Sequence, residues 1–274
     1  MVVEGFLVGL HQSPYHGFSA EFSQHRPYIQ GDSLRNVDWK AYAKSDKYYI
    51  KQFEEETNLI CNIYLDISNS MSFKYTSEVT KLEYGITLAA GLSYLLINQK
   101  DAAGITLYSD KIDTYLPPKS TKVHLHTILS VLSKAEPKGK TALSNCLEQI
   151  TEKIKKRGLT IFISDFLEDT QLILRILKQV HFKKNEVIVF QILDPVERNF
   201  NFDADSTFVD LETGDEVLTQ PHHIKKAYRE KMSKQLEHLK KECYKLGIEY
   251  NLLDTSQSFD KALMSYFMKR AKMN

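Results

Sequence analysis

The hydrophobic pattern changes character along the chain, and from residue 58 onward it alternates between two periods. Short continuous runs of apolar and β-branched residues are typical of strands buried on both faces of a sheet. They predict strands over Asn58–Leu65, Gly104–Tyr108, Leu159–Ile163, Glu186–Leu193 and Ile248–Leu253. Two weaker patterns predict a hairpin strand over Ile112–Tyr115 and a hairpin that turns at Thr213-Gly214.

Between these strands, apolar residues recur at the three- and four-residue spacing of a helix face, as Leu82, Ile86 and Ala89 do. This spacing predicts helices over Val79–Asn98, Val123–Leu132, Thr141–Lys156, Thr170–Val180, residues 222–246 and Phe259–Lys269. Strands that alternate with helices of this length predict a doubly wound, mostly parallel sheet with helices on both faces. We therefore expect an α/β fold.

The first 55 residues lack this alternation and are rich in aromatic, glycine and charged residues. They predict ordered loops followed by one strand over Tyr48–Phe53. We expect residues 1–55 to form an extension that packs on a main domain of residues 56–274. The run Glu54-Glu55-Glu56 is interpreted as a charged strand end, with an acidic recognition patch as the alternative.

Composition narrows the class of protein. Of 274 residues, 42% are hydrophobic and 26% charged, which suits a globular protein with a sizeable core. The net charge of +1 gives no electrostatic reason to expect nucleic-acid or anionic-membrane binding. No apolar stretch approaches the ~20 residues of a membrane span. We expect a cytoplasmic protein in which Cys61, Cys146 and Cys243 are reduced and mostly buried.

Polar residues follow several predicted strands, at the edge where ligands bind in open α/β sheets. These rim residues are Asp66, Ser68, Ser70, Asp110, Asp165 and Asp194. In the stretch "LDISNSMSF", Asp66, Ser68 and Ser70 alternate, so their side chains point the same way on an extended backbone. Such oxygen-only donors suit a hard cation such as Mg²⁺. The alternative is that the serines only make turn and N-cap bonds.

Two distant residues, Thr141 and Asp165, are predicted on the same rim. With Asp66, Ser68 and Ser70 they resemble the metal-ion-dependent adhesion site of von Willebrand factor A domains. That resemblance implies that the two serines bind the ion directly and that the aspartates bind it directly or through water. Thr141 would switch between those modes. The implied cofactor is Mg²⁺, or else Mn²⁺ or Ca²⁺, and the alternative is a site that holds no ion.

A second resemblance rests on the pattern Arg-x-Tyr-x-x-Gly-Asp-x-x-Arg-x-x-Asp-Trp. It is met by Arg26, Tyr28, Gly31, Asp32, Arg35, Asp38 and Trp39. With "ISDFLED" and "EVIVFQILDPVE", the pattern is similar to the bacterial family known as domain of unknown function fifty-eight. The resemblance implies a von Willebrand factor A-like fold, a MoxR-type AAA+ ATPase as partner, and a role in assembling or activating an unidentified client protein.

One departure from that family lies beside the predicted ion site. Here the sequence is Gly139-Lys140-Thr141, where family members often have Gly-Gly-Thr. Lys140 either points to solvent or weakens cation binding. The N-terminal motif is interpreted as structural, with Asp32, Arg35 and Asp38 as a charge network and Trp39 packed on the sheet; a binding role is the alternative.

The function predicted from these features is a non-enzymatic, metal-dependent protein-interaction module. The alternative is a Mg²⁺-dependent phosphohydrolase that uses the same strand end. The aspartyl-phosphate type needs a second aspartate two residues after the first, and Ser68 stands there. A G-x-S-x-G nucleophile elbow is absent from the sequence as well. We therefore assign no catalytic residue.

Overall fold

The computed structural model divides into two compact units, of which the smaller is His11–Asn58. The structure describes residues 20–29, 37–45, 47–55, 59–140, 146, 149–150, 152–154, 158–202, 206–209, 216–219 and 221–257.

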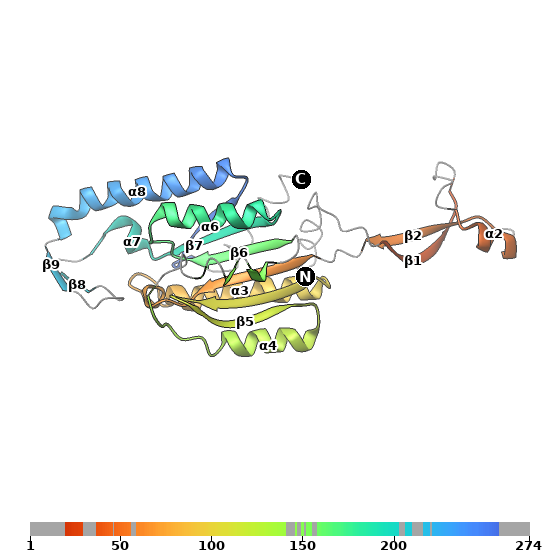
Figure 1. The fold of residues 1–274 in the computed structure, drawn as a ribbon, viewed down its shortest axis with the longest axis horizontal. Coiled ribbons are helices and arrows are strands. Elements are labelled where there is room, and N and C mark those ends of the chain that lie inside the picture. Colours follow the sequence, from red (N-terminus) through yellow and green to blue (C-terminus); the bar gives the residue numbers. More distant parts are fainter. Residues whose placement is uncertain are drawn as a thin grey trace. The chain divides into compact units, whose positions relative to one another are not determined.

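In the part of the chain that the structure describes, the larger unit contains a six-stranded sheet in the order β10-β7-β6-β3-β4-β5 (Figure 1). The strands are β3 (Ile60–Asp66), β4 (Ala102–Tyr108), β5 (Ile112–Lys119), β6 (Leu159–Ser164), β7 (Glu186–Leu193) and β10 (Glu249–Asp254). Neighbouring strands are parallel except β4 and β5, which form the predicted hairpin. The strand predictions are confirmed, with ends that differ by a few residues.

Helices cover both faces of this sheet. One face carries α3 (Lys81–Asn98) and α4 (Lys122–Leu132), and the other carries α6 (Thr170–Phe182) and α8 (Pro221–Lys245) (Figure 1). Thr80 starts α3 through a capping box with Glu83, in which each side chain bonds the other residue's backbone N–H. Two short elements follow strand ends and were not predicted: the 3₁₀ turn η3 (Asn69–Ser72) and α7 (Pro195–Asn199).

The alternation of side chains along each strand divides the core into two layers. Ile63 and Leu65 of β3 pack under α3 and α4, whereas Tyr64 between them packs on the opposite face with Phe162 of β6. All three β3 residues are fully buried, so the strand has no solvent face. This explains why its sequence is a continuous apolar run. The three cysteines are free and buried, as predicted.

The smaller unit contains an antiparallel ribbon of β1 (Ala20–Pro27) and β2 (Tyr49–Glu55), together with α2 (Trp39–Ser45). The strand prediction near residue 50 is confirmed, and Glu54 and Glu55 are its last residues. The prediction of loops before that strand was wrong for β1 and α2. The sequence of β1 is mostly polar and α2 is only seven residues long, so neither carries a readable hydrophobic period.

The remaining predictions are described only in part. The strands β8 (Ser206–Val209) and β9 (Glu216–Thr219) pair antiparallel, as the predicted hairpin requires, but its turn lies outside the described residues. The predicted helix over Phe259–Lys269 and most of that over Thr141–Lys156 also lie outside them. None of the described helices combines the length and apolar character that crossing a bilayer requires.

Candidate functional site

The direction in which successive strands are added to the sheet reverses beside β3, and the candidate site lies there. After β3 the chain adds β4 and β5 on one side, then crosses over to add β6, β7 and β10 on the other. The carboxyl ends of β3 and β6 therefore flank the switch point at which open α/β sheets bind ligands. Asp66 ends β3, and Asp165 directly follows β6.

Asp66 is fully buried, and both of its carboxylate oxygens accept hydrogen bonds. The backbone N–H of Ser68 donates to Oδ1 at 2.8 Å, and Ser164 Oγ donates to Oδ2 at 2.7 Å. Burial and, secondarily, the charge of Asp165 raise the pKa of Asp66 to about 7, against these hydrogen bonds. The buried carboxylates of Asp66 and Asp165 are therefore close enough to repel each other, and a cation would reduce this repulsion.

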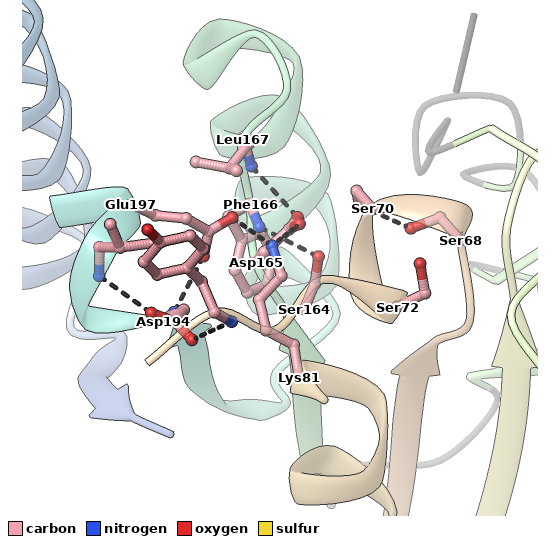
Figure 2. A network of polar contacts seen from close by, with 12 residues as sticks. Ser68, Ser70, Ser72, Lys81, Ser164, Asp165, Phe166, Leu167, Asp194 and Glu197 are labelled. Carbon is pink, nitrogen blue, oxygen red and sulfur yellow. Dashed lines mark hydrogen bonds and ion pairs between the residues drawn. The ribbon is translucent and has the colours of Figure 1, made fainter. Parts of the chain in front are cut away.

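Ser68 and Ser70 direct their hydroxyls toward each other, with 3.1 Å between the two Oγ atoms (Figure 2). Ser68 occupies the N-cap position of η3, but its side chain makes no capping hydrogen bond. Ser72, in the same turn, instead donates to the backbone carbonyl of Asn69 at 2.7 Å. The capping interpretation therefore fails for Ser68.

The backbone of this loop is held by a neighbouring segment. Lys138 N–H donates to the Ile67 carbonyl at 2.7 Å, and Asn69 N–H donates to the Gly139 carbonyl at 3.0 Å. Gly139 has a φ of +73°, and a Cβ there would lie 2.9 Å from Asp110 Oδ1. A side chain at this position is therefore disfavoured both by backbone conformation and by space.

Asp165 is fully buried and is paired with Lys81, the first residue of α3. Lys81 Nζ lies 2.8 Å from Asp165 Oδ2 and 2.7 Å from Glu197 Oε1, so one ammonium bridges two carboxylates (Figure 2). Burial alone would lower the pKa of Lys81, but Asp165 and Glu197 raise it above its ordinary value. Phe166, which directly follows Asp165, has a φ of +50°. This conformation is rare for bulky side chains, and such residues are found preferentially at functional sites.

Asp194, the rim residue after β7, organises the opposite side of the network. Its Oδ1 accepts the N–H of Val196 at 2.9 Å, and its Oδ2 accepts the N–H groups of Tyr75 and Thr76, each at 2.9 Å. Glu197 Oε2 accepts the N–H of Asp194 at 2.9 Å, which completes a capping box at the start of α7. Asp194 therefore places Glu197 within reach of Lys81 (Figure 2).

The predicted site residues are brought together in part. Asp66, Ser68, Ser70 and Asp165 lie at the carboxyl ends of two adjacent strands, β3 and β6. Thr141 lies outside the described residues, so its place in the site stays a prediction. Lys140 is exposed.

A divalent cation that takes oxygen ligands fits the donors that the structure describes. A Mg²⁺–oxygen distance of 2.0–2.1 Å places neighbouring ligands of an octahedron about 3.0 Å apart. The two serine hydroxyls have nearly this separation. Among the described residues, no group of three or more His, Cys, Asp and Glu side chains could hold a metal, so hydroxyl donors are essential to any such site there.

The N-terminal motif residues that are described have structural contacts. Asp38 Oδ1 accepts the N–H groups of Lys40 and Ala41, which caps α2, and the N–H of Tyr28 donates to the Tyr48 carbonyl. Trp39 meets Tyr42 edge to face and is 57% exposed. Arg26 Nη1 donates to the carbonyl of the next residue. Gly31, Asp32 and Arg35 lie outside the described residues.

A match to the family described as protein of unknown function DUF58 spans residues 24–240. The chain belongs to this family. Uncharacterized proteins Rv1480 of Mycobacterium tuberculosis and Mb1516 of Mycobacterium bovis are each 25% identical to it over 215 residues, which is 77% of this chain and 67% of each relative. Neither the family description nor these names includes an enzymatic activity.

One solved structure of low sequence identity has the same fold. The conserved hypothetical protein BatB of Bacteroides thetaiotaomicron aligns with a TM-score of 0.50 and 21% identity over 77% of this chain and 98% of its own. The SpRpn10 VWA domain aligns with a TM-score of 0.47 and 13% identity over 76% and 95%. With the observed sheet order, the predicted fold class, a doubly wound von Willebrand factor A-like fold, is confirmed. At this identity the likeness shows the fold alone.

Three residues that shape the site were not predicted from the sequence: Ser164, Lys81 and Glu197. Ser164 is the last residue of β6 and looked like part of the strand end. Lys81 lies between Val79 and Leu82 near the start of the predicted helix over Val79–Asn98, where a lysine is usually solvated. For Glu197 a signal existed, because Asp-Pro-x-Glu has the N-cap aspartate, the N1 proline and the N3 glutamate of a helix start.

Proposed function

We propose that this chain is a non-enzymatic protein-interaction module that binds Mg²⁺ or Mn²⁺ at Asp66, Ser68, Ser70, Thr141 and Asp165. The observation that carries the proposal is the Ser68–Ser70 hydroxyl pair, 3.1 Å apart, beside two buried carboxylates. Its function would be to present a metal ion to an acidic group of another protein. The von Willebrand factor A-like fold and the family support an interaction module at the coarser level.

The donor set favours a small ion. Ca²⁺ takes about 6–8 oxygen ligands, often several of them carboxylates, whereas the described donors here are two hydroxyls and two carboxylates that already have partners. Mg²⁺ keeps several waters and is bound by one or two carboxylates. An ion here would supply a positive charge that the neutral hydroxyls do not cancel.

Asp66 and Asp165 leave little negative charge free to neutralise an ion, because their oxygens already have partners. Both oxygens of Asp66 accept hydrogen bonds, and Oδ2 of Asp165 is paired with Lys81. An ion held mainly by hydroxyl oxygens attracts a further carboxylate, and a partner's Asp or Glu side chain offers one. The same burial of Asp66 disfavours its use as a nucleophile in the phosphohydrolase alternative.

The partner in this proposal is a MoxR-type AAA+ ATPase, with an unidentified client protein whose assembly or activation the pair serves. This assignment rests on the family resemblance. The test is capture of the ATPase from the same organism by the purified full chain in Mg²⁺ buffer, compared with buffer that contains a chelator. The expected result is capture that the chelator reduces at least about tenfold, a loss of about 1.4 kcal/mol of binding free energy.

The matched variants lie in one turn. Ser68→Ala/Ser70→Ala removes the proposed hydroxyl ligands, whereas Ser72→Ala removes a serine whose hydroxyl bonds the Asn69 carbonyl. We expect the double variant to lose capture and the single variant to retain it. Equal capture by both variants, or capture that ignores the chelator, would show that the proposed ion site does not mediate the interaction.

A further inference from the structure

Lys81 is the charged group that the predicted ion site did not include. Its side chain is 1% exposed, and its ammonium is shared between Asp165 at 2.8 Å and Glu197 at 2.7 Å. A buried ammonium is stable only when its charge and its hydrogen-bond donors are satisfied, and these two carboxylates satisfy them. Lys81 therefore bridges a proposed ion ligand, Asp165, and the partly buried Glu197 (Figure 2).

Two sets of contacts fix the position of Lys81 and its ammonium partner Glu197. The backbone N–H of Lys81 donates to the Phe73 carbonyl, at the end of the loop that carries Ser68 and Ser70. Glu197 is placed by the capping box with Asp194 at the start of α7. Lys81 is thus built into the site rather than being a long side chain that folds over it.

We propose that Lys81 determines the affinity of the site for a divalent cation, because its ion pair with Asp165 reduces the negative charge that Asp165 offers the ion. This inference rests on the proposed function. Because Oδ2 of Asp165 is paired with Lys81, Asp165 offers an ion less negative charge than a free carboxylate would. The ion then binds less tightly and keeps more of its charge for a partner's carboxylate.

Glu197 has the opposite effect on the same pair. It competes with Asp165 for the ammonium, so it leaves Asp165 partly available to an ion. Removing the charge of Glu197 commits Lys81 to Asp165 and lowers ion affinity, whereas removing Lys81 raises it. A salt bridge that only stabilised the fold would not move ion affinity in these opposite directions.

The experiment is titration of the purified full chain with Mn²⁺, followed by the electron paramagnetic resonance of free Mn²⁺ at fixed pH and ionic strength. Lys81→Met leaves Asp165 and Glu197 without a counter-ion, which endangers folding. Lys81→Met/Glu197→Gln removes one charge of each sign, so that only Asp165 loses its ion-pair partner. Lys245→Met is the matched control, because Lys245 forms an exposed ion pair with Glu242 at 2.6 Å.

We expect Lys81→Met/Glu197→Gln to bind Mn²⁺ at least about tenfold more tightly than the unmodified chain, and Glu197→Gln to bind it at least about threefold less tightly. Lys81→Arg, which keeps the charge, and Lys245→Met are expected to stay within about twofold. Circular dichroism and thermal unfolding establish that each variant is folded.

Two results separate this inference from the proposed function. If Mn²⁺ binding depends on Ser68 and Ser70 but the folded Lys81 and Glu197 variants leave the affinity unchanged, the inference is wrong and the ion site stands. If Mn²⁺ binding survives Ser68→Ala/Ser70→Ala, the ion site itself is misplaced and both fail. Failure of the folded double variant to bind more tightly overturns the inference, whatever the unmodified chain does.

Discussion

Ser164 at the end of β6 donates a hydrogen bond of 2.7 Å to Asp66 at the end of β3, and this bond joins the two strand ends that flank the switch point. The same Ser164 oxygen accepts the N–H of Phe166 at 3.1 Å, so one hydroxyl also supports the left-handed turn after Asp165. The orientation of both candidate carboxylates therefore depends on a serine that does not itself belong to the predicted ion site.

Replacing Ser164 by alanine should lower the free energy of unfolding by about 1–3 kcal/mol, because a buried carboxylate oxygen and a buried N–H lose their partner. Mn²⁺ affinity should fall as well, since Asp66 is no longer oriented. Urea unfolding and Mn²⁺ titration measure the two effects. Ser93→Ala is the control: Ser93 is also buried, but it donates to the Ala89 carbonyl within α3. Weakened ion binding in that control would mean that losing any buried serine has the effect.

Removing the two proposed hydroxyl ligands should change ion binding far more than stability. For Ser68→Ala/Ser70→Ala we expect at least about a tenfold loss of Mn²⁺ affinity. The free energy of unfolding without ion should fall by only about 1 kcal/mol, because the two serine hydroxyls bond each other and Asp66 keeps its bonds from Ser68 N–H and Ser164. Saturating Mn²⁺ should raise the melting temperature of the unmodified chain but not of the variant. A melting temperature that rises equally in both would place the ion elsewhere.

Gly139→Ala tests how tightly the loop beside the serines is packed. Alanine at a φ of +73° is strained, and its Cβ would meet Asp110 and Ser109 at 2.9 and 3.0 Å. Gly247→Ala is a matched control, because Gly247 has a φ of +69° and no atom near its would-be Cβ. In both variants backbone strain should lower the free energy of unfolding by about 1 kcal/mol. In Gly139→Ala the close contacts of the new Cβ should lower it by about 1 kcal/mol more. Equal losses in urea unfolding would show that the contact with Asp110 is not restrictive.

Asp194→Asn should destabilise the fold by about 2 kcal/mol at pH 7, because an amide has one acceptor oxygen where the carboxylate uses two. Burial acts to raise the pKa of Asp194, but hydrogen bonds from Val196, Tyr75 and Thr76 outweigh it and hold the pKa below its ordinary value. The carboxylate's contribution is therefore complete above the ordinary aspartate pKa of about 3.9 and is lost as the pH falls through the lowered value.

Urea unfolding of both proteins from pH 7 to about pH 3.5 checks this pH dependence, and the difference between them should shrink only at the acid end. Asp169→Asn is the control, since Asp169 caps α6 at an exposed position with one bond of 2.8 Å to Gln171. The free energy of unfolding should fall by only about 1 kcal/mol in Asp169→Asn. A larger difference for Asp194→Asn at low pH than at pH 7 would contradict the assigned direction.

The sheet was predictable from sequence because each central strand is buried on both faces. The apolar run that ends at Leu65 could lie nowhere but inside, and the aspartate after it marked the strand end. For the same reason Asp66 and Asp165 could be assigned to one edge before their contacts were known. The ribbon of β1 and β2 was only half predicted, since hydrogen bonding between strands leaves no period in a polar sequence.

The charge arrangement of the site was not predictable in this way. Lys81 has the chemistry of a solvated helix residue, and only the approach of Asp165 and of Glu197 in three dimensions shows that it is buried. These partners lie 84 and 116 residues away along the chain. A pattern read over neighbouring residues cannot detect a pairing of that range. Glu197 could have been assigned to a helix start, but not to a lysine.

The pairing of Lys81 with Asp165 also bears on how the protein matures. A site of closely spaced carboxylates with no cation of its own would resist folding until a metal arrived. Here Lys81 of the same chain pairs with Asp165, so the native state needs no metal ion to balance this carboxylate. In the proposed function, metal loading is then a step that follows folding rather than a condition for it.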